Sequence, residues 1–221
     1  MISALQLLGT LKNVFLHKKE LVMSATATLT LSEQTAAKVT SSGKRTISLQ
    51  NFLARYTNRE DPFKYEWNNG IVEKKARTMN RDQFLIFQHL LQVFLKTKAY
   101  REGALLMAEV DMYLPFANRT RRTDIAYLTS EQMKKSHDNE PTVCPFVIEV
   151  ISKNDQANEV GQKLIEYFAD GVEVVWVVFP KVKKVEVYRS RKEVTICFDD
   201  DICSAAPVLP DFEISVNALF T

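Results

Sequence analysis

Short apolar runs of the kind that form β-strands dominate the second half of the chain. After Gly103 they include "ALLMAEVDMYL", "RTDIAYL" and "PFVIEVIS". The run "VEVVWVVF" after Gly171 is continuously apolar, which predicts a central strand covered on both faces. The next segment, "KKVEVYR", alternates, with Val185 and Val187 on one side, as an outer strand with one wet face does. The pattern therefore predicts that a β-sheet is the centre of the fold.

Helical spacing of apolar residues appears between and before these strands. From about Arg81 to Lys98 the apolar positions cover well over half of a helix circumference, which predicts a largely buried helix. The segment "DQANEVGQKLIEYFADG" predicts a second helix, which Asp155 can cap and Gly171 can end. Earlier, "ISLQNFLARY" predicts a short helix and "KYEWNNGIVEKK" a β-hairpin that turns at Asn-Asn-Gly. This order indicates an α/β or α+β fold with a sheet between helices.

The chain of 221 residues has enough material for one sizeable core. Residues 24–45 are rich in Ser, Thr and Ala, which is typical of a flexible lead-in. We therefore expect an N-terminal extension over residues 1–46, weakly ordered or partly helical, and one folded domain over residues 47–221. Translation could begin at Met1 or at Met23.

Charge and cysteine content leave several classes of partner open. The formal net charge of +2 neither supports nor excludes a nucleic-acid partner. The three cysteines include no C-x-x-C pair, so neither a disulfide framework nor a structural zinc site is indicated. The N-terminal stretch has no secretory core and no apolar span near the length that a membrane requires. We therefore expect a cytoplasmic protein without a membrane anchor.

Glu149 is the one acid in the apolar run "PFVIEVIS". Burial of an unpaired carboxylate costs several kcal/mol, roughly, unless a cation, a metal or a proton compensates it. Asp124 lies in "RTDIAYL", on the strand before, again in an apolar setting. If the two strands are neighbours, the two carboxylates converge, and such a pair suits a hard cation such as Mg²⁺.

The helix that follows Glu149 carries a candidate third group. Lys163 lies at the edge of the helix's apolar face, about 40° from Tyr167 at 100° per residue. From there its amine can lean toward the sheet, where it could pair with Glu149 or orient an attacking water. A solvated lysine is the competing interpretation.

At this point the sequence resembles a known family. "KYEWNNGIVE", "RTDIAYL", the long stretch from Phe146 to Arg189 and the tail "SAAPVLPDFEISVNALF" are similar to the Uma2 family of restriction-type endonucleases, a branch of the PD-(D/E)XK nuclease superfamily. The resemblance runs from about Ile47 to the C-terminus. It implies a restriction endonuclease-like core, in which helices flank a mixed central sheet, and a phosphodiesterase that depends on Mg²⁺ or Mn²⁺.

The resemblance also assigns roles to individual residues. Asp124 matches the family's strand acid and Glu149 the acid of the next strand, and both would hold the metal. Lys163 matches a lysine moved onto the helix, because Ile151 stands where the superfamily's strand lysine would be. Glu66 in "KYEW" matches a further acid. Alternatively, Glu66 could pair across the hairpin with a lysine such as Lys74.

The implied reaction is hydrolysis of DNA by metal-activated water. Arg119, Arg121 and Arg122 could hold DNA phosphates near the metal, and a solvated loop is the other interpretation of these three residues. A homodimer is expected by analogy, because the cutting of both strands needs two sites.

Two departures from the family pattern keep other functions open. Thr123 stands where the family usually has a proline, and "TMNRDQF" lacks the histidine that many members carry at the start of the long helix. A catalytically degenerate nuclease fold that binds DNA or protein is therefore the alternative. A small-molecule hydrolase that uses the same metal site is a third possibility.

Overall fold

The computed structural model describes residues 46–57, 59–76, 81–135, 142–152 and 155–221. The chain divides into two units, Met1–Thr46 and Ile47–Thr221. The expected N-terminal extension, apart from Thr46, and the candidate start at Met23 lie outside the described residues. The fold below is that of the unit Ile47–Thr221.

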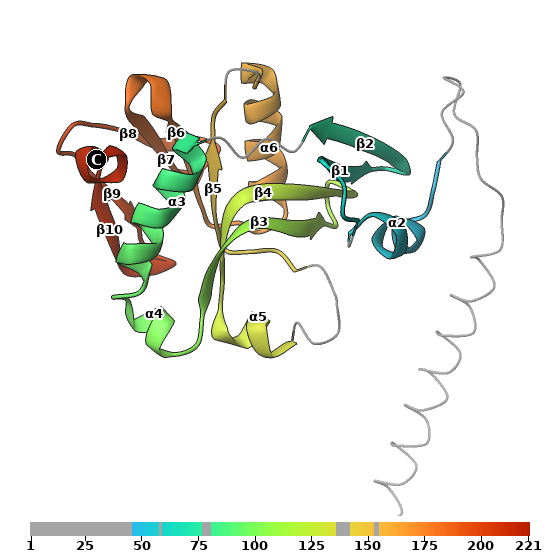
Figure 1. Ribbon diagram of the computed structural model, residues 1–221, viewed down its shortest axis with the longest axis horizontal. Coiled ribbons are helices and arrows are strands. Elements are labelled where there is room, and N and C mark those ends of the chain that lie inside the picture. The colour runs from blue at the N-terminus through green and yellow to red at the C-terminus, as the bar shows by residue number, and fades with distance from the viewer. Residues whose placement is uncertain (1–45, 58, 77–80, 136–141, 153–154) are drawn as a thin grey trace, which may run out of the picture. The chain divides into compact units, whose positions relative to one another are not determined.

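An eight-stranded sheet forms the centre of the described residues (Figure 1). Its strands are β1 (Phe63–Asn68), β2 (Ile71–Ala76), β3 (Leu105–Leu114), β4 (Arg119–Leu128), β5 (Phe146–Val150), β6 (Val174–Phe179), β7 (Lys184–Ser190) and β8 (Glu193–Phe198). They lie in the order β2-β1-β4-β5-β6-β7-β8, and β3 pairs with β4. Only β5 and β6 pair in parallel among these strands, so the sheet is mixed, as expected.

Helices and a small second sheet complete this unit. The helices are α2 (Leu49–Tyr56), α3 (Arg81–Phe94), α4 (Lys98–Arg101), α5 (Ser130–Lys135), α6 (Ala157–Ala169) and α7 (Val216–Phe220), with a 3₁₀ turn at Pro180–Val182. The small sheet pairs β9 (Ile202–Ala205) with β10 (Leu209–Ser215). None of the described helices is long and apolar enough to cross a membrane.

The main sheet is covered on both faces. Side chains alternate along β5, so that Phe146 and Ile148 pack with α3, β9, β10 and α7, whereas Val147 packs with α6. On β6, Trp176 faces the first of these layers and Val175 the second. The expectation that "VEVVWVVF" is a central strand with two covered faces is therefore confirmed.

The N-terminal helix and the hairpin also form as predicted. Helix α2 begins after Ser48, whose hydroxyl accepts a hydrogen bond from the backbone N–H of Asn51. Strands β1 and β2 turn at Asn69 and Gly70, whose φ angles are 45° and 92°. Both angles lie in the left-handed region that Asn and Gly tolerate best.

Two details of the helices differ from the expectation. Helix α3 ends at Phe94, and its residues Phe84 and Leu85 are exposed, so only one side of the helix is buried. Helix α6 is preceded by Gln156, which makes no capping bond. Asp155 instead accepts a hydrogen bond from the backbone N–H of Ser152 at 2.6 Å.

Candidate active site

The structure brings the two predicted strand acids together. Strands β4 and β5 are antiparallel neighbours with Ile125 opposite Ile148, and this register places Asp124 opposite Glu149 on the face that α6 covers. One oxygen of Asp124 accepts a hydrogen bond from the backbone N–H of Val150 at 2.8 Å. Strand β4 begins at Arg119, so Asp124 lies in its middle. The acid is therefore not a residue at the start of the strand that only bonds to the local backbone.

Helix α6 supplies two donors to the buried carboxylate of Glu149, which is only 4% exposed. The Lys163 amine lies 2.6 Å from one oxygen, and the Tyr167 hydroxyl donates to the other at 2.5 Å. Residues four apart lie on the same side of a helix, which is why both reach the same carboxylate. The expected contact between Lys163 and Glu149 is therefore present.

Burial and charge set the protonation of this group of side chains. Burial, together with the negative charge of Glu149, raises the pKa of Asp124 to about 6, although Lys64 and Lys163 act against this. Burial disfavours the charged amine of Lys163, but Glu149 and Asp124 outweigh it, so the pKa of Lys163 is raised. Burial and Glu149 also raise the pKa of Tyr167. Lys163 is therefore an ammonium group at neutral pH, and the site uses it as a cation rather than as a base.

The acids face a pocket of about 350 Å³. Two further lysines line it, Lys64 from β1 and Lys75 from β2, and the Lys64 amine lies 3.9 Å from Asp124. The two lysines are directly opposite each other in the hairpin. Like charges in that position repel, and each amine is compensated from outside the hairpin: Lys64 lies near Asp124, and Lys75 contacts Glu159 of α6. Sequence reasoning missed both lysines, although a turn at Asn69 and Gly70 already makes them cross-strand partners.

Glu66 lies behind the pocket and does not line it. Its carboxylate contacts the Arg121 guanidinium at 2.9 Å and lies 3.9 Å from the Lys75 amine. Burial opposes its charge, but Arg121, Lys75 and Lys163 prevail and lower the pKa of Glu66. The lysine of the neighbouring strand near Glu66 is therefore Lys75 and not Lys74, whose amine lies 3.5 Å from the centre of the Phe63 ring.

The three arginines before Asp124 belong to β4 and not to a solvated loop, so that interpretation is wrong. Arg121 is 2% exposed, and Arg119 and Arg122 are also largely covered. Carboxylate partners for the three guanidinium groups are Glu66, Glu73, Glu166 and Asp111. Most of their donors are used inside the protein, although the Nε of Arg119 has no partner among the described residues, so the suggested contact with DNA phosphates stays a prediction that these ion pairs do not favour.

Arg121 joins β4 to α6 instead. Its guanidinium donates to Glu166 at 2.8 Å, and Glu166 lies between Lys163 and Tyr167 on the helix. Arg119 donates to the other oxygen of Glu166 at 3.0 Å. These buried contacts hold α6 in the position from which Lys163 and Tyr167 reach Glu149.

The donor set fits a small hard cation. Asp124 and Glu149 provide carboxylate oxygens from adjacent strands, and Mg²⁺ commonly takes one or two carboxylates and keeps its other ligands as waters. The described residues contain no cluster of three or more His, Cys, Asp or Glu side chains of the kind that encloses a metal. The pKa of Asp124 is raised first by burial and then by the negative charge of Glu149, and a bound cation would compensate both. Ile151, which stands where the superfamily's strand lysine would be, packs beside α6. The lysine that contacts the Glu149 carboxylate is Lys163.

Comparisons with known proteins agree with this fold. The family model described as "Uma2: Putative restriction endonuclease" matches residues 49–217. The chain belongs to this family. The resemblance found in the sequence is therefore confirmed over most of the unit Ile47–Thr221.

A solved structure shows the same fold. It is a crystal structure described as "a putative nuclease belonging to DUF820 from Anabaena variabilis ATCC 29413". The TM-score is 0.64 at 17% sequence identity, and the match covers 79% of this chain and 97% of that chain. The expected restriction endonuclease-like architecture is thereby confirmed. A comparison with curated proteins found no match.

Proposed function

We propose that this protein is an endonuclease that hydrolyses DNA phosphodiester bonds and depends on Mg²⁺ or Mn²⁺. One observation carries the proposal: Asp124 and Glu149 lie side by side at a pocket, with the Lys163 amine 2.6 Å from Glu149. Membership of the Uma2 family supports a nuclease. The two acids form the kind of site that binds a hard divalent cation.

Asp124 and Glu149 would hold the metal, and a metal bound there supplies Lewis-acid stabilisation and lowers the pKa of a bound water. Tyr167 fixes the orientation of Glu149 through its hydrogen bond. Lys163 remains protonated, so its role is to stabilise negative charge that develops on the scissile phosphate.

Lys64 and Lys75 are the proposed phosphate contacts, in place of the arginines of β4. Both lysines line the pocket that contains the acids, and although Lys75 also pairs with Glu159, these side chains are less buried than the arginines and can turn toward a phosphate there. Positive charge on a protein surface provides most of the sequence-independent affinity for DNA. A homodimer in the cytoplasm is the proposed working form, because cleavage of both strands needs two sites.

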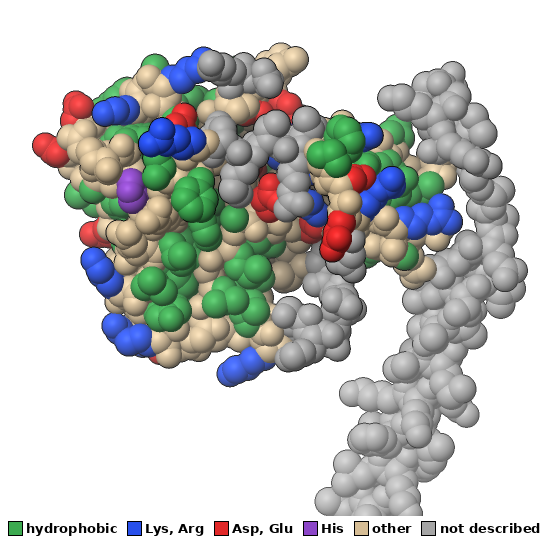
Figure 2. Space-filling view, viewed as in Figure 1, with side chains coloured by type: hydrophobic (Ala, Val, Ile, Leu, Met, Phe, Trp, Pro, Cys, Tyr) green, Lys and Arg blue, Asp and Glu red, His purple; other side chains and the backbone are tan. Residues whose placement is uncertain are grey.

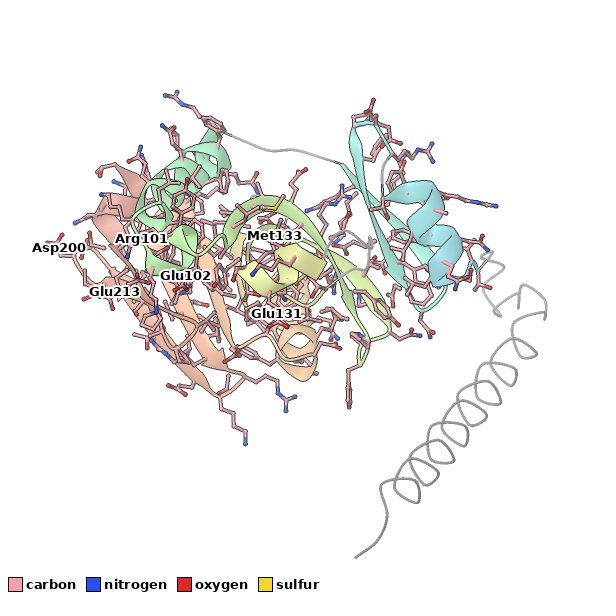
Figure 3. All side chains as sticks on the ribbon, turned by 90° about the horizontal axis from the view of Figure 1, so that it is seen from below. Arg101, Glu102, Glu131, Met133, Asp200 and Glu213 are labelled. Atoms are coloured by element: carbon pink, nitrogen blue, oxygen red, sulfur yellow. The ribbon has the colours of Figure 1, made fainter. Side chains whose placement is uncertain are left out.

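Metal binding tests the site directly. We expect calorimetric titration of Mg²⁺ or Mn²⁺ to show binding to the wild-type protein and a loss of about ten-fold or more in affinity for Glu149→Gln. The matched control is Glu213→Gln, which changes an exposed acid of β10 and is expected to bind metal as the wild type does (Figure 3). Equal metal binding by wild type and Glu149→Gln would overturn the proposed site.

DNA cleavage tests the activity. Purified protein with Mg²⁺ or Mn²⁺ is expected to cut plasmid, single-stranded or branched DNA, and Lys163→Met is expected to lower the rate by about a hundred-fold or more. Lys181→Met is the control, because this exposed lysine lies outside the pocket. If all three DNA substrates remain intact at high protein concentration, the degenerate nuclease fold replaces the present proposal for those substrates. Thr123, in place of the family's proline, favours that alternative.

A further inference from the structure

A second ion pair lies at the pocket of the candidate site, nearer to solvent than the pair of Lys163 with Glu149. It joins Lys75 of β2 to Glu159 in the first turn of α6, 84 residues later, and both side chains line the pocket. These side chains are 33% and 35% exposed, whereas those of Lys163 and Glu149 are 14% and 5% exposed. The pair of Lys75 with Glu159 is therefore the outer of the two.

Lys75 has two acidic neighbours, and only one of them can easily be exchanged for another anion. Glu66 lies 3.9 Å from the Lys75 amine, but its side chain is 2% exposed and also contacts Arg121 at 2.9 Å. Glu159 is partly exposed, and it pairs with no other basic side chain that the structure describes. Glu159 is therefore the partner that a bound ligand could displace from Lys75.

The physical chemistry of this pair favours such an exchange. Ion pairs in contact with water contribute little to stability, because water and salt compete with both partners. Lysine has a flexible stem and a compact charge, so the Lys75 amine can turn from one anion to another. A DNA phosphate gains from the exchange, because its condensed counterions are released when a lysine neutralises it.

DNA phosphates would have to compete with acids of the protein for its lysines. Among the described residues, basic and acidic side chains are intermixed around the β1–β2 hairpin on the face that Figure 2 shows. The formal net charge of the whole chain is only +2. Positive charge for a phosphate at this pocket therefore depends on how tightly the lysines are held by their own acidic partners.

We propose that Glu159 sets the affinity of the site for DNA by competing with a backbone phosphate for Lys75. In the free protein the Glu159 carboxylate occupies the place of that phosphate at the Lys75 amine. When DNA binds, the amine turns to the phosphate and Glu159 is released to water. This competition rests on the proposed function, because it takes DNA as the substrate.

A purely structural role, in which the pair fastens the hairpin to α6, is the other interpretation. Arg119 already joins these elements more deeply, because it contacts Glu73 of β2 at 3.1 Å and Glu166 of α6 at 3.0 Å. Its side chain is 9% exposed, so water competes little for these contacts. A further tie at the exposed side of the pocket adds little to the fold, whereas at that place it meets an incoming phosphate.

Removal of the competing charge tests the proposal. Glu159→Gln is expected to raise the affinity for DNA by about five-fold or more, and Lys75→Met is expected to lower it by a similar factor. Fluorescence anisotropy of a labelled oligonucleotide, single-stranded and duplex, measures both variants. Ca²⁺ replaces Mg²⁺ in this assay, because it takes the same oxygen ligands in a looser geometry and so separates binding from cleavage.

A double variant separates competition for Lys75 from the general effect of one negative charge fewer. In the Lys75→Met background there is no amine to release, so Glu159→Gln is expected to change the affinity by about two-fold or less. Asp82→Asn is the matched control, since Asp82 is an exposed acid in the first turn of α3 that does not line the pocket. It too is expected to change the affinity by about two-fold or less.

Three results would overturn the competition while leaving the proposed function in place. The first is DNA binding that Glu159→Gln does not strengthen. The second is an equal gain from Glu159→Gln with and without Lys75, which would mean that Glu159 repels DNA directly. The third is a Glu159→Gln protein that melts below the assay temperature, which would make the pair a structural tie. If no variant binds either oligonucleotide at about 100 μM protein, the proposed function fails as well.

Discussion

At the scale of single residues, the notable feature is a pair of acids held together inside the protein. Asp124 and Glu149 lie on adjacent strands, and Glu149 is compensated by Lys163 and Tyr167. Asp124 has weaker compensation, a backbone N–H at 2.8 Å and the Lys64 amine at 3.9 Å. Two neighbouring buried acids lower the stability of the folded protein unless a cation binds between them. Such pairs are expected at functional sites, where residues are selected for function rather than for stability.

Asp124→Asn is expected to stabilise the metal-free protein. The pKa of Asp124 is raised from 3.8 to about 6, so the folded state prefers the protonated acid and loses stability as the pH rises through that interval. Asparagine keeps the acceptor for Val150 and removes the charge. We expect a gain of about 2 kcal/mol in the free energy of unfolding at pH 7.5, falling to less than half of that at pH 4.5.

Urea unfolding in the presence of EDTA, at both pH values, measures this effect. Asp211→Asn is the control, because this exposed acid also accepts a backbone hydrogen bond, from Lys98 at 2.7 Å, and no such gain is expected. The same gain at both pH values, or none at pH 7.5, would contradict the assigned cause.

Tyr167→Phe is expected to lower the free energy of unfolding by about 1.5–3 kcal/mol, because it removes a donor from a buried, charged carboxylate. The chain offers a matched control in Tyr188→Phe, where the hydroxyl donates to Glu186 at 2.8 Å in a half-buried setting. A smaller loss is expected there, since water can replace the donor. Chemical denaturation at pH 7 compares the two variants, and equal losses would argue against a special role of burial at Glu149.

At the scale of elements, the contact between β4 and α6 determines whether the site exists. Arg121 donates to Glu166 and to Glu66, and in this way joins the strand that carries Asp124 to the helix that carries Lys163. Arg119 reinforces the contact through Glu166. These arginines act as structural cations between elements, which explains why they are buried beside the candidate site and yet do not line its pocket.

Arg121→Met is expected to destabilise the protein by about 3–5 kcal/mol, because Glu66 and Glu166 lose their shared cation inside the protein. Arg122→Met is the control, since its pair with Asp111 is less deeply buried. Thermal and urea unfolding measure both variants. A loss no larger than that of Arg122→Met would show that the buried network is not needed to hold α6 on β4.

At the scale of the whole unit, an aromatic cluster joins segments that are distant in sequence. The ring of Phe212 in β10 contacts the rings of Phe94 in α3, Phe146 in β5 and Trp176 in β6, at centroid distances of 6.4, 5.8 and 5.6 Å. The C-terminal strands are therefore part of the main core and pack against the sheet that carries the site.

Phe212→Ala is expected to cost about 3–5 kcal/mol, because Phe212 is fully buried and the cavity lies where three elements meet. Phe84→Ala, which truncates an exposed phenylalanine of α3, is expected to change stability by about 0.5 kcal/mol or less. Urea unfolding of both variants gives the comparison. A small loss for Phe212→Ala would mean that the C-terminal strands unfold separately from the sheet.

Much of this protein could be predicted from the local pattern of its sequence. Alternation along "KKVEVYR", the continuous run around Trp176 and the Asn-Asn-Gly turn specified strands and the hairpin, since side-chain periodicity and turn chemistry act over a few residues. The isolated acid in "PFVIEVIS" indicated the site, because a charge inside an apolar strand needs compensation. The helix period also placed Lys163 toward Glu149, as the structure has it.

Only the tertiary structure decided the partners of the remaining charges. The run from Arg119 to Arg122 has the composition of a solvated loop, and it is buried because β1 and α6 bring Glu66 and Glu166 to it. Lys64 and Lys75 reach Asp124 and its pocket because β1 lies beside β4, a pairing that no local pattern specifies. Periodicity determines which face a side chain occupies, whereas the strand order and the packing of helices determine which charge it meets there.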